Sequence, residues 1–94
     1  MLDGLKDFIN DANKIIRKEN RKINELHREI ENYNTLIYVI GQTGTFEQVL
    51  YYKEKINHCY FKIDICMENI KNSRDRIATM KAVNKIIKRG EKCG

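Results

Sequence analysis

Residues 9–40 read INDANKIIRKENRKINELHREIENYNTLIYVI, and isoleucine returns in this stretch every seven positions. The row consists of Ile9, Ile16, Ile23, Ile30 and Ile37. Apolar residues that alternate three and four apart keep one narrow stripe of a helix turned toward a partner helix. The stretch therefore predicts a long helix that packs in the manner of a coiled coil.

Extending this heptad phase along the chain defines two seam columns, a and d. In the first half, column a holds Leu2 and the five isoleucines, and column d holds Leu5, Ala12, Glu19, Leu26, Tyr33 and Ile40. In the second half, column a holds Val49, Ile56, Ile63, Ile70, Ile77 and Asn84, and column d holds Tyr52, Cys59, Cys66, Ser73, Met80 and Ile87. Two stretches with the same period predict two helices that pack along each other.

A cluster of helix-breaking residues, Gly41-Gln42-Thr43-Gly44, separates the two stretches. Gly41 suits the left-handed position that follows the last turn of a helix. Thr45 followed by Gln48 has the form of a capping box, and Asp3 suits the N-cap of the first helix. We expect a helix over about residues 4–40, a loop at 41–45, a helix over about 46–89 and a tail at 90–94.

The predicted fold of residues 1–94 is a single all-α domain, an antiparallel two-helix coiled-coil hairpin. Helices of similar length joined by a short loop lie antiparallel, so positions whose numbers add to roughly 86 to 89 should be neighbours. An alternative remains, because the polar segment 72–75, Asn-Ser-Arg-Asp, contains cap-forming residues. A break of the second helix near Asn72-Ser73 would give three helices.

Self-association is expected, because a two-helix hairpin of this size buries little apolar surface on its own. A symmetric dimer that forms a four-helix bundle is the common solution. Near the loop, apolar residues also occur outside the seam columns, which is typical of a self-association or partner surface. The residues that we expect to bind a partner are Tyr38, Val39, Leu50, Tyr51, Phe61 and Ile65.

Composition describes one small helical domain, with 94 residues, no proline, 41% hydrophobic and 33% charged residues. No apolar run approaches the roughly 20 residues that span a bilayer, and the N-terminus lacks the pattern of a signal peptide. We therefore expect a cytoplasmic protein with no membrane partner. Richness in Lys, Asn, Ile and Tyr is what AT-rich genes encode, so we expect a low-GC bacterium, or a phage or plasmid living in one, as the source.

No residues form a pattern that indicates catalysis. His27 should fold back near His58 and Cys59, but the chain has no C-x-x-C or H-x-x-x-H spacing, so a core and surface role is favoured over zinc binding. Glu19 is the one acid in the seam, and a general acid would need a second group and a pocket. Three cysteines, an odd number, argue against a disulfide framework. The sequence predicts no enzyme, no cofactor and no metal.

Charge is distributed unevenly, because residues 1–44 hold seven acids and seven bases while the whole chain carries +5. The basic residues crowd the end of the second helix, where Lys81, Lys85, Lys88 and Arg89 could follow nucleic-acid phosphates. The favoured hypothesis is a non-enzymatic protein–protein interaction module that acts as a homo-oligomer, a small adaptor or inhibitor encoded by a phage or other mobile element. Its alternative is a nucleic-acid-binding protein that uses this basic helix.

Overall fold

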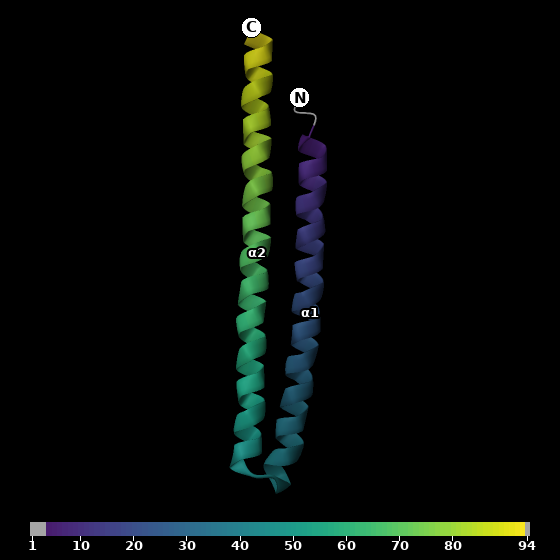
Figure 1. The fold of residues 1–94 in the computed structure, drawn as a ribbon, viewed down its shortest axis with the longest axis vertical. Coiled ribbons are helices and arrows are strands. Elements are labelled where there is room, and N and C mark those ends of the chain that lie inside the picture. Colours follow the sequence, from purple (N-terminus) through teal and green to yellow (C-terminus); the bar gives the residue numbers. More distant parts are fainter. Residues whose placement is uncertain (1–3, 94) are drawn as a thin grey trace.

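The computed structural model describes the backbone of residues 4–93 and the side chains of residues 4–90. It consists of two helices, α1 (Leu5–Thr43) and α2 (Phe46–Cys93). They lie side by side and antiparallel, joined at one end by Gly44 and Thr45 (Figure 1). The predicted all-α hairpin is therefore confirmed.

The second helix is continuous through Asn72 and Ser73, so the structure has two helices and not three. Ser73 falls in column d and is buried against α1, with 5% of its surface exposed. Its neighbours in the seam, Ile70 and Ile77, are also withdrawn from solvent. Burial of the seam on both sides of Ser73 outweighs the weak helix preference of a short polar segment.

The seam predicted from the heptads is the core of the structure. Every described residue of columns a and d is buried or half-buried, and outside those columns only Asn13 is half-buried. The central cluster consists of Leu26, Ile30, Cys59, Ile63 and Cys66, with Ile23, Tyr33 and Ile56 packed against it. The Tyr33 and Tyr52 rings lie 5.8 Å apart, and Cys59 contacts Glu29. Their numbers add to 85 and 88, close to the predicted register.

The helix ends differ from the prediction. α1 continues through Gly41 to Thr43, and no glycine within residues 4–93 adopts a positive φ. Gly44 is extended (φ −96°, ψ 179°), and its N–H donates a hydrogen bond to the carbonyl of Ile40. α2 likewise passes Gly90 and ends at Cys93. A glycine inside a helix costs only about 1 kcal/mol, which is too little to stop a helix whose hydrogen bonds continue.

The caps at the two helix starts are of different kinds. The predicted capping box is confirmed, because Thr45 N–H donates to Gln48 Oε1 at 3.1 Å and Gln48 N–H donates to Thr45 Oγ1 at 3.3 Å. At the start of α1, Gly4 occupies the N-cap without a side-chain hydrogen bond. The predicted cap, Asp3, lies outside the described residues. The side chain of Thr45 therefore fixes the point at which α2 begins.

The hairpin is long and thin, with extents of 77 × 15 × 13 Å. Its radius of gyration is 21.5 Å, against about 12 Å for a compact chain of the same length. α2 is longer than α1 and extends beyond it at the open end (Figure 1). Neither helix, over its described residues, combines the length and the apolar character that crossing a bilayer requires. Each helix is covered only along its seam.

Candidate functional site

Two lateral faces flank the seam, one on each side of the hairpin. Helix periodicity places heptad columns g and c on one side of the seam and columns e and b on the other. A groove on the first side is lined by Lys22 of α1 and Ile65 of α2, and a groove on the second by His27 and Met67. We call the side with columns g and c the Ile65 face, and the side with columns e and b the His27 face.

Exposed large apolar side chains concentrate on the Ile65 face, which carries eight of the fourteen among the described residues. They are Phe8, Ile15, Leu36 and Val39 of α1 and Tyr51, Ile65, Val83 and Ile86 of α2. The His27 face carries Tyr38, Phe46, Leu50, Tyr60 and Met67, and Phe61 lies on the outer edge of α2. Apolar side chains along the whole of one face, beside a thin core, are typical of an interaction surface.

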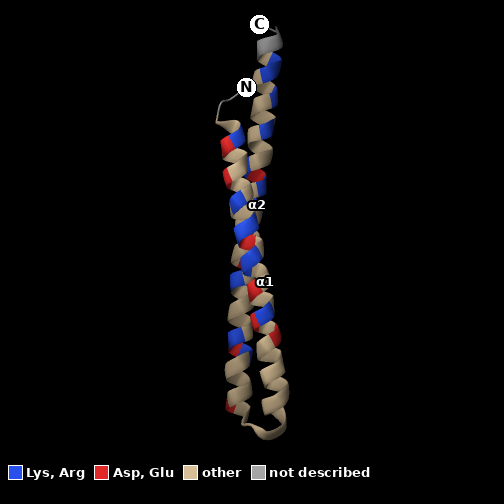
Figure 2. Cartoon of the chain, turned by 90° about the vertical axis from the view of Figure 1, so that its right-hand side faces the viewer, with Lys and Arg blue, Asp and Glu red and all other residues tan. Residues whose placement is uncertain are grey.

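All six residues of the predicted partner site are exposed, from Leu50 at 45% to Tyr38 at 72%. They lie on different sides of the hairpin, with Val39, Tyr51 and Ile65 on the Ile65 face, Tyr38 and Leu50 on the His27 face, and Phe61 on the edge. Most of them surround the loop end, where residues 32–46 contain no charged side chain (Figure 2). The sequence thus correctly predicted that the loop end is apolar, and the structure shows that its apolar side chains lie on two different faces of the hairpin.

The open-end half of the Ile65 face was missed by sequence reasoning. It consists of Phe8 and Ile15 on α1 and Val83 and Ile86 on α2. A signal was present, because Phe8, Ile15 and Leu36 all occupy column g. A helix whose columns a, d and g are apolar has the wider stripe of a helix that packs against more than one neighbour.

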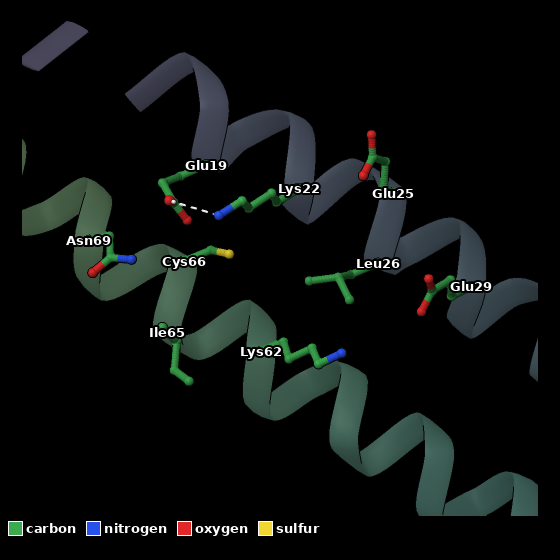
Figure 3. A pocket seen from close by; sticks show the side chains of 9 residues that line it. All are labelled: Glu19, Lys22, Glu25, Leu26, Glu29, Lys62, Ile65, Cys66 and Asn69. Carbon is green, nitrogen blue, oxygen red and sulfur yellow. Dashed lines mark hydrogen bonds and ion pairs between the residues drawn. The ribbon is translucent and has the colours of Figure 1, made fainter. Parts of the chain in front are cut away.

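The centre of the Ile65 face is a groove of about 320 Å³ around Glu19 (Figure 3). Glu19 is 6% exposed, and its Oε1 accepts from Lys22 Nζ at 3.5 Å. Hydrogen bonding from the Cys66 thiol, followed by the charge of Lys22, lowers the pKa of Glu19, although burial acts in the opposite direction. Its Oε2 has no well-formed hydrogen bond within the described residues. The predicted seam acid is thus charged, buried and only partly satisfied.

Cys59 and Cys66 each lie in the seam beside a carboxylate of α1. Cys59 Sγ donates to Glu29 Oε2 at 3.4 Å, and burial together with this carboxylate raises the pKa of the Cys59 thiol. Burial and Glu19 raise the pKa of the Cys66 thiol in the same way. Only a thiolate is a good nucleophile or metal ligand, and these two thiols stay protonated at neutral pH. Their arrangement is that of core residues.

The two histidines are on opposite faces, because His27 occupies column e and His58 occupies column c. His27 lines the groove of its own face, and His58 is exposed on the other. Within residues 4–90, no three His, Cys, Asp or Glu side chains come together at a spacing that could hold a metal ion. The predicted neighbourhood of His27, His58 and Cys59 therefore does not form a joint site.

Basic residues concentrate on the His27 face. Within residues 4–90 its columns hold eight bases and only two acids, Glu31 and Asp64; the bases are Lys6, Arg17, Lys53, Lys71, Arg74, Lys81, Lys85 and Lys88. Three of the predicted nucleic-acid-binding residues, Lys81, Lys85 and Lys88, lie on this stripe, whereas Arg89 lies on the outer edge. Basic residues follow α2 toward its C-terminal end (Figure 2). Positive charge therefore lies mainly opposite the apolar Ile65 face.

Comparison with known proteins finds no match to a protein-family model, to a curated protein or to a solved structure.

Proposed function

We propose that this protein is a non-enzymatic protein–protein interaction module that acts as a homo-oligomer, in the role of a small adaptor or inhibitor encoded by a phage or other mobile element. The observation that carries the proposal is the set of eight exposed apolar side chains along the Ile65 face. Apolar surface of this extent is stabilised by being covered. The described site offers binding surface and no reactive group.

The exposed area supports self-association. The hairpin exposes 7465 Å², whereas a compact monomer of this mass exposes about 5,700 Å². The excess of one chain, about 1,800 Å², is more than the roughly 800 Å² that each partner buries in a standard protein–protein interface. A face that runs the length of a 77 Å hairpin offers enough surface for such an interface. Covering the Ile65 face with a second copy would give each helix a second apolar contact.

A different partner would bind at the loop end. Tyr38, Leu50 and Phe61 do not lie on the Ile65 face, so they stay exposed when that face is covered. Tyrosine and phenylalanine supply large contact areas at a small cost in side-chain entropy, which is why they anchor many interfaces. This assignment gives the apolar residues near the loop two roles, self-association on one side of the hairpin and partner binding on the other.

Light scattering after gel filtration tests the self-association. We expect a dimer mass for the wild type and a monomer mass for Ile65→Asp, because the change would bury an unpaired charge in an apolar interface. Phe61→Asp is the matched control, since Phe61 is exposed and apolar but lies on the edge. It should keep the dimer mass. A wild-type monomer at micromolar concentration would contradict the proposal, and dissociation by Phe61→Asp alone would move the interface to the edge.

Partner binding requires a separate test with the dimer intact. Wild-type protein and a Tyr38→Ser variant would serve as bait in a lysate of the host, with the dimer mass of both confirmed beforehand. A protein that the wild type retains and the variant loses is the expected result. Equal recovery by both baits would place the contact elsewhere on the hairpin.

The basic stripe of the His27 face favours nucleic-acid binding as a second candidate function. Phosphate contacts release counterions, so affinity should fall steeply between about 50 and 200 mM salt. Titrating a labelled duplex and a single strand with wild type and with Lys81, Lys85 and Lys88 changed to Gln tests this. Changing Lys14, Arg21 and Arg28, which are exposed on the outer edge of α1, to Gln removes the same charge and is the control. Equal loss in both variants would indicate net charge alone.

A further inference from the structure

We infer that the Ile65 face is covered by a second copy of this chain that lies with its loop at the same end, so that α1 of each copy packs on α2 of the other. The inference rests on the proposed self-association and adds its orientation. Two hairpins stacked face to face have two symmetric arrangements. Either the loops meet at one end and α1 lies on α2, or the loops point to opposite ends and each helix lies on its own equivalent.

The charges of the Ile65 face distinguish the two arrangements. On this face α2 carries three bases, Lys55, Lys62 and Arg76, and its described columns contain no acid. The three acids of the face, Asp11, Glu25 and Glu29, all lie on α1, together with two bases, Lys18 and Lys22. Stacking α2 on α2 would therefore bring only bases together, which is unfavourable. Stacking α1 on α2 brings the acids of one copy to the bases of the other.

The register makes this complementarity specific. Within one hairpin, neighbouring positions of α1 and α2 have numbers that add to about 85 to 88, as for Glu29 and Cys59. When the loops of two copies lie at the same height, the same rule aligns α1 of one copy with α2 of the other. It places Asp11 opposite Arg76 and Glu25 opposite Lys62. It also places Leu36 opposite Tyr51, which joins two exposed apolar residues at the loop end.

The partly satisfied Glu19 supports the same arrangement. With both loops at one end, Glu19 of one copy lies at the same height along the dimer as Glu19 of the other copy. Lys22 and Asn69 line the groove beside Glu19, so in this arrangement those of both copies lie near the two carboxylates. With the loops at opposite ends and the two α1 helices centred on each other, Glu19 would instead meet the level of Glu29, a second acid. A polar layer within an apolar interface fixes the alignment of helices when it meets its own equivalent.

Distances between spin labels test the orientation. The labels are placed on Gln42→Cys in a full-length variant with Cys59→Ala, Cys66→Ala and Cys93→Ser, after its helical circular dichroism and its mass are checked. In the inferred arrangement the loop labels lie within about 30 Å, because packed helices are about 8–10 Å apart. In the opposite arrangement they lie more than about 50 Å apart, since each helix spans about 1.5 Å per residue. A label on Arg21→Cys, near the middle of α1, gives a short distance in both arrangements and controls for the presence of the dimer.

The outcomes separate this inference from the proposed function. A short loop distance together with a short Arg21→Cys distance supports the inferred arrangement. A long loop distance with a short central one overturns the orientation and leaves self-association intact. A monomer mass, with no dipolar coupling at either label, overturns both. The change Lys62→Glu reverses a charge in the interface and should weaken dimerisation at least tenfold. Adding Glu25→Lys to that variant restores a pair of opposite charges and should recover most of the loss.

Discussion

Cys59 Sγ donates a hydrogen bond to Glu29 Oε2 on the opposite helix, with the two atoms 3.4 Å apart. The contact joins the two helices in the most buried part of the seam, where Cys59 is 4% exposed. Burial raises the pKa of the Cys59 thiol, and the Glu29 carboxylate raises it further, because it accepts a hydrogen bond from the protonated thiol and its negative charge disfavours a thiolate. One heptad along α2, burial and the Glu19 carboxylate likewise raise the pKa of the Cys66 thiol.

These thiols should therefore react slowly. In a Cys93→Ser variant, which leaves only Cys59 and Cys66, a disulfide reagent at about pH 8 should modify the folded protein at least tenfold more slowly than the urea-unfolded one. One unit of pKa corresponds to a tenfold change in thiolate, and burial slows access further. Release of the reagent's chromophore measures the rate. Equal rates in folded and unfolded protein would contradict a buried, protonated pair.

Glu19 should make stability depend on pH. Its pKa is lowered in the folded protein, so its ionised form contributes stability above the unfolded pKa of about 4.3, and that contribution is lost as the pH falls through the lowered folded value. When the pH is lowered from about 6 to about 3, the free energy of unfolding of the wild type should therefore fall by more than that of Glu19→Gln. Urea unfolding at a fixed protein concentration measures it.

Glu31→Gln is the control for this experiment. Glu31 is an exposed acid of α1, outside the seam and outside the Ile65 face. Glu31→Gln removes one charge from the surface of α1 and leaves the buried Glu19 in place. A pH dependence as large as that of Glu19→Gln would show that the effect comes from overall charge and not from burial of Glu19.

Two glycines near the loop should respond oppositely to alanine. At Gly41, inside α1, an added Cβ meets nothing within 4 Å, so Gly41→Ala should stabilise by about 0.5–1 kcal/mol. At Gly44 an added Cβ would overlap the Ile40 side chain and lie 2.7 Å from the Ile40 carbonyl oxygen. Gly44→Ala should therefore destabilise by about 1–3 kcal/mol. Thermal unfolding of both variants checks the signs, and a stabilising Gly44→Ala would mean that the connection is free to move.

Removing the cap of α2 should also lower stability. Thr45→Ala deletes the oxygen that accepts from Gln48 N–H, and such changes cost about 1 kcal/mol. Thr35→Ala is a matched control, because Thr35 donates only to the carbonyl of Glu31 within α1. Alanine is the better helix former there, so the control should be neutral or slightly stabilising. Equal losses in both variants would argue against the capping role.

The fold could be predicted from the sequence because one signal, the seven-residue period, decides the burial of both helices. Even Ser73 and Asn84, which are polar, are buried where their columns require it. The helix ends could not be predicted as well, since Gly41 and Gly90 change the local free energy by only about 1 kcal/mol. When the difference in free energy is this small, neighbouring contacts determine where the helix ends, and here the contact is the hydrogen bond from the Gly44 N–H to the Ile40 carbonyl.

The candidate site was predicted only in part. Exposure of Tyr38 and Phe61 follows from their heptad columns, and the structure confirms it. The division of the site residues between two faces depends on whether each lies in column b or in column c, and it becomes evident only when the helices are paired. The unsatisfied oxygen of Glu19 depends on the positions of individual atoms, which no heptad pattern contains.

The connection of only two residues, Gly44 and Thr45, has a consequence for the uniqueness of the fold. Because isoleucine recurs every seven positions, the seam alone would accept one helix displaced lengthwise by a heptad, about 10.5 Å, with isoleucine again facing isoleucine. Two residues cannot span such a displacement without unwinding a helix end. The connection therefore selects a single alignment from several of similar energy, and the same two helices supplied as separate peptides should associate in a mixture of offsets.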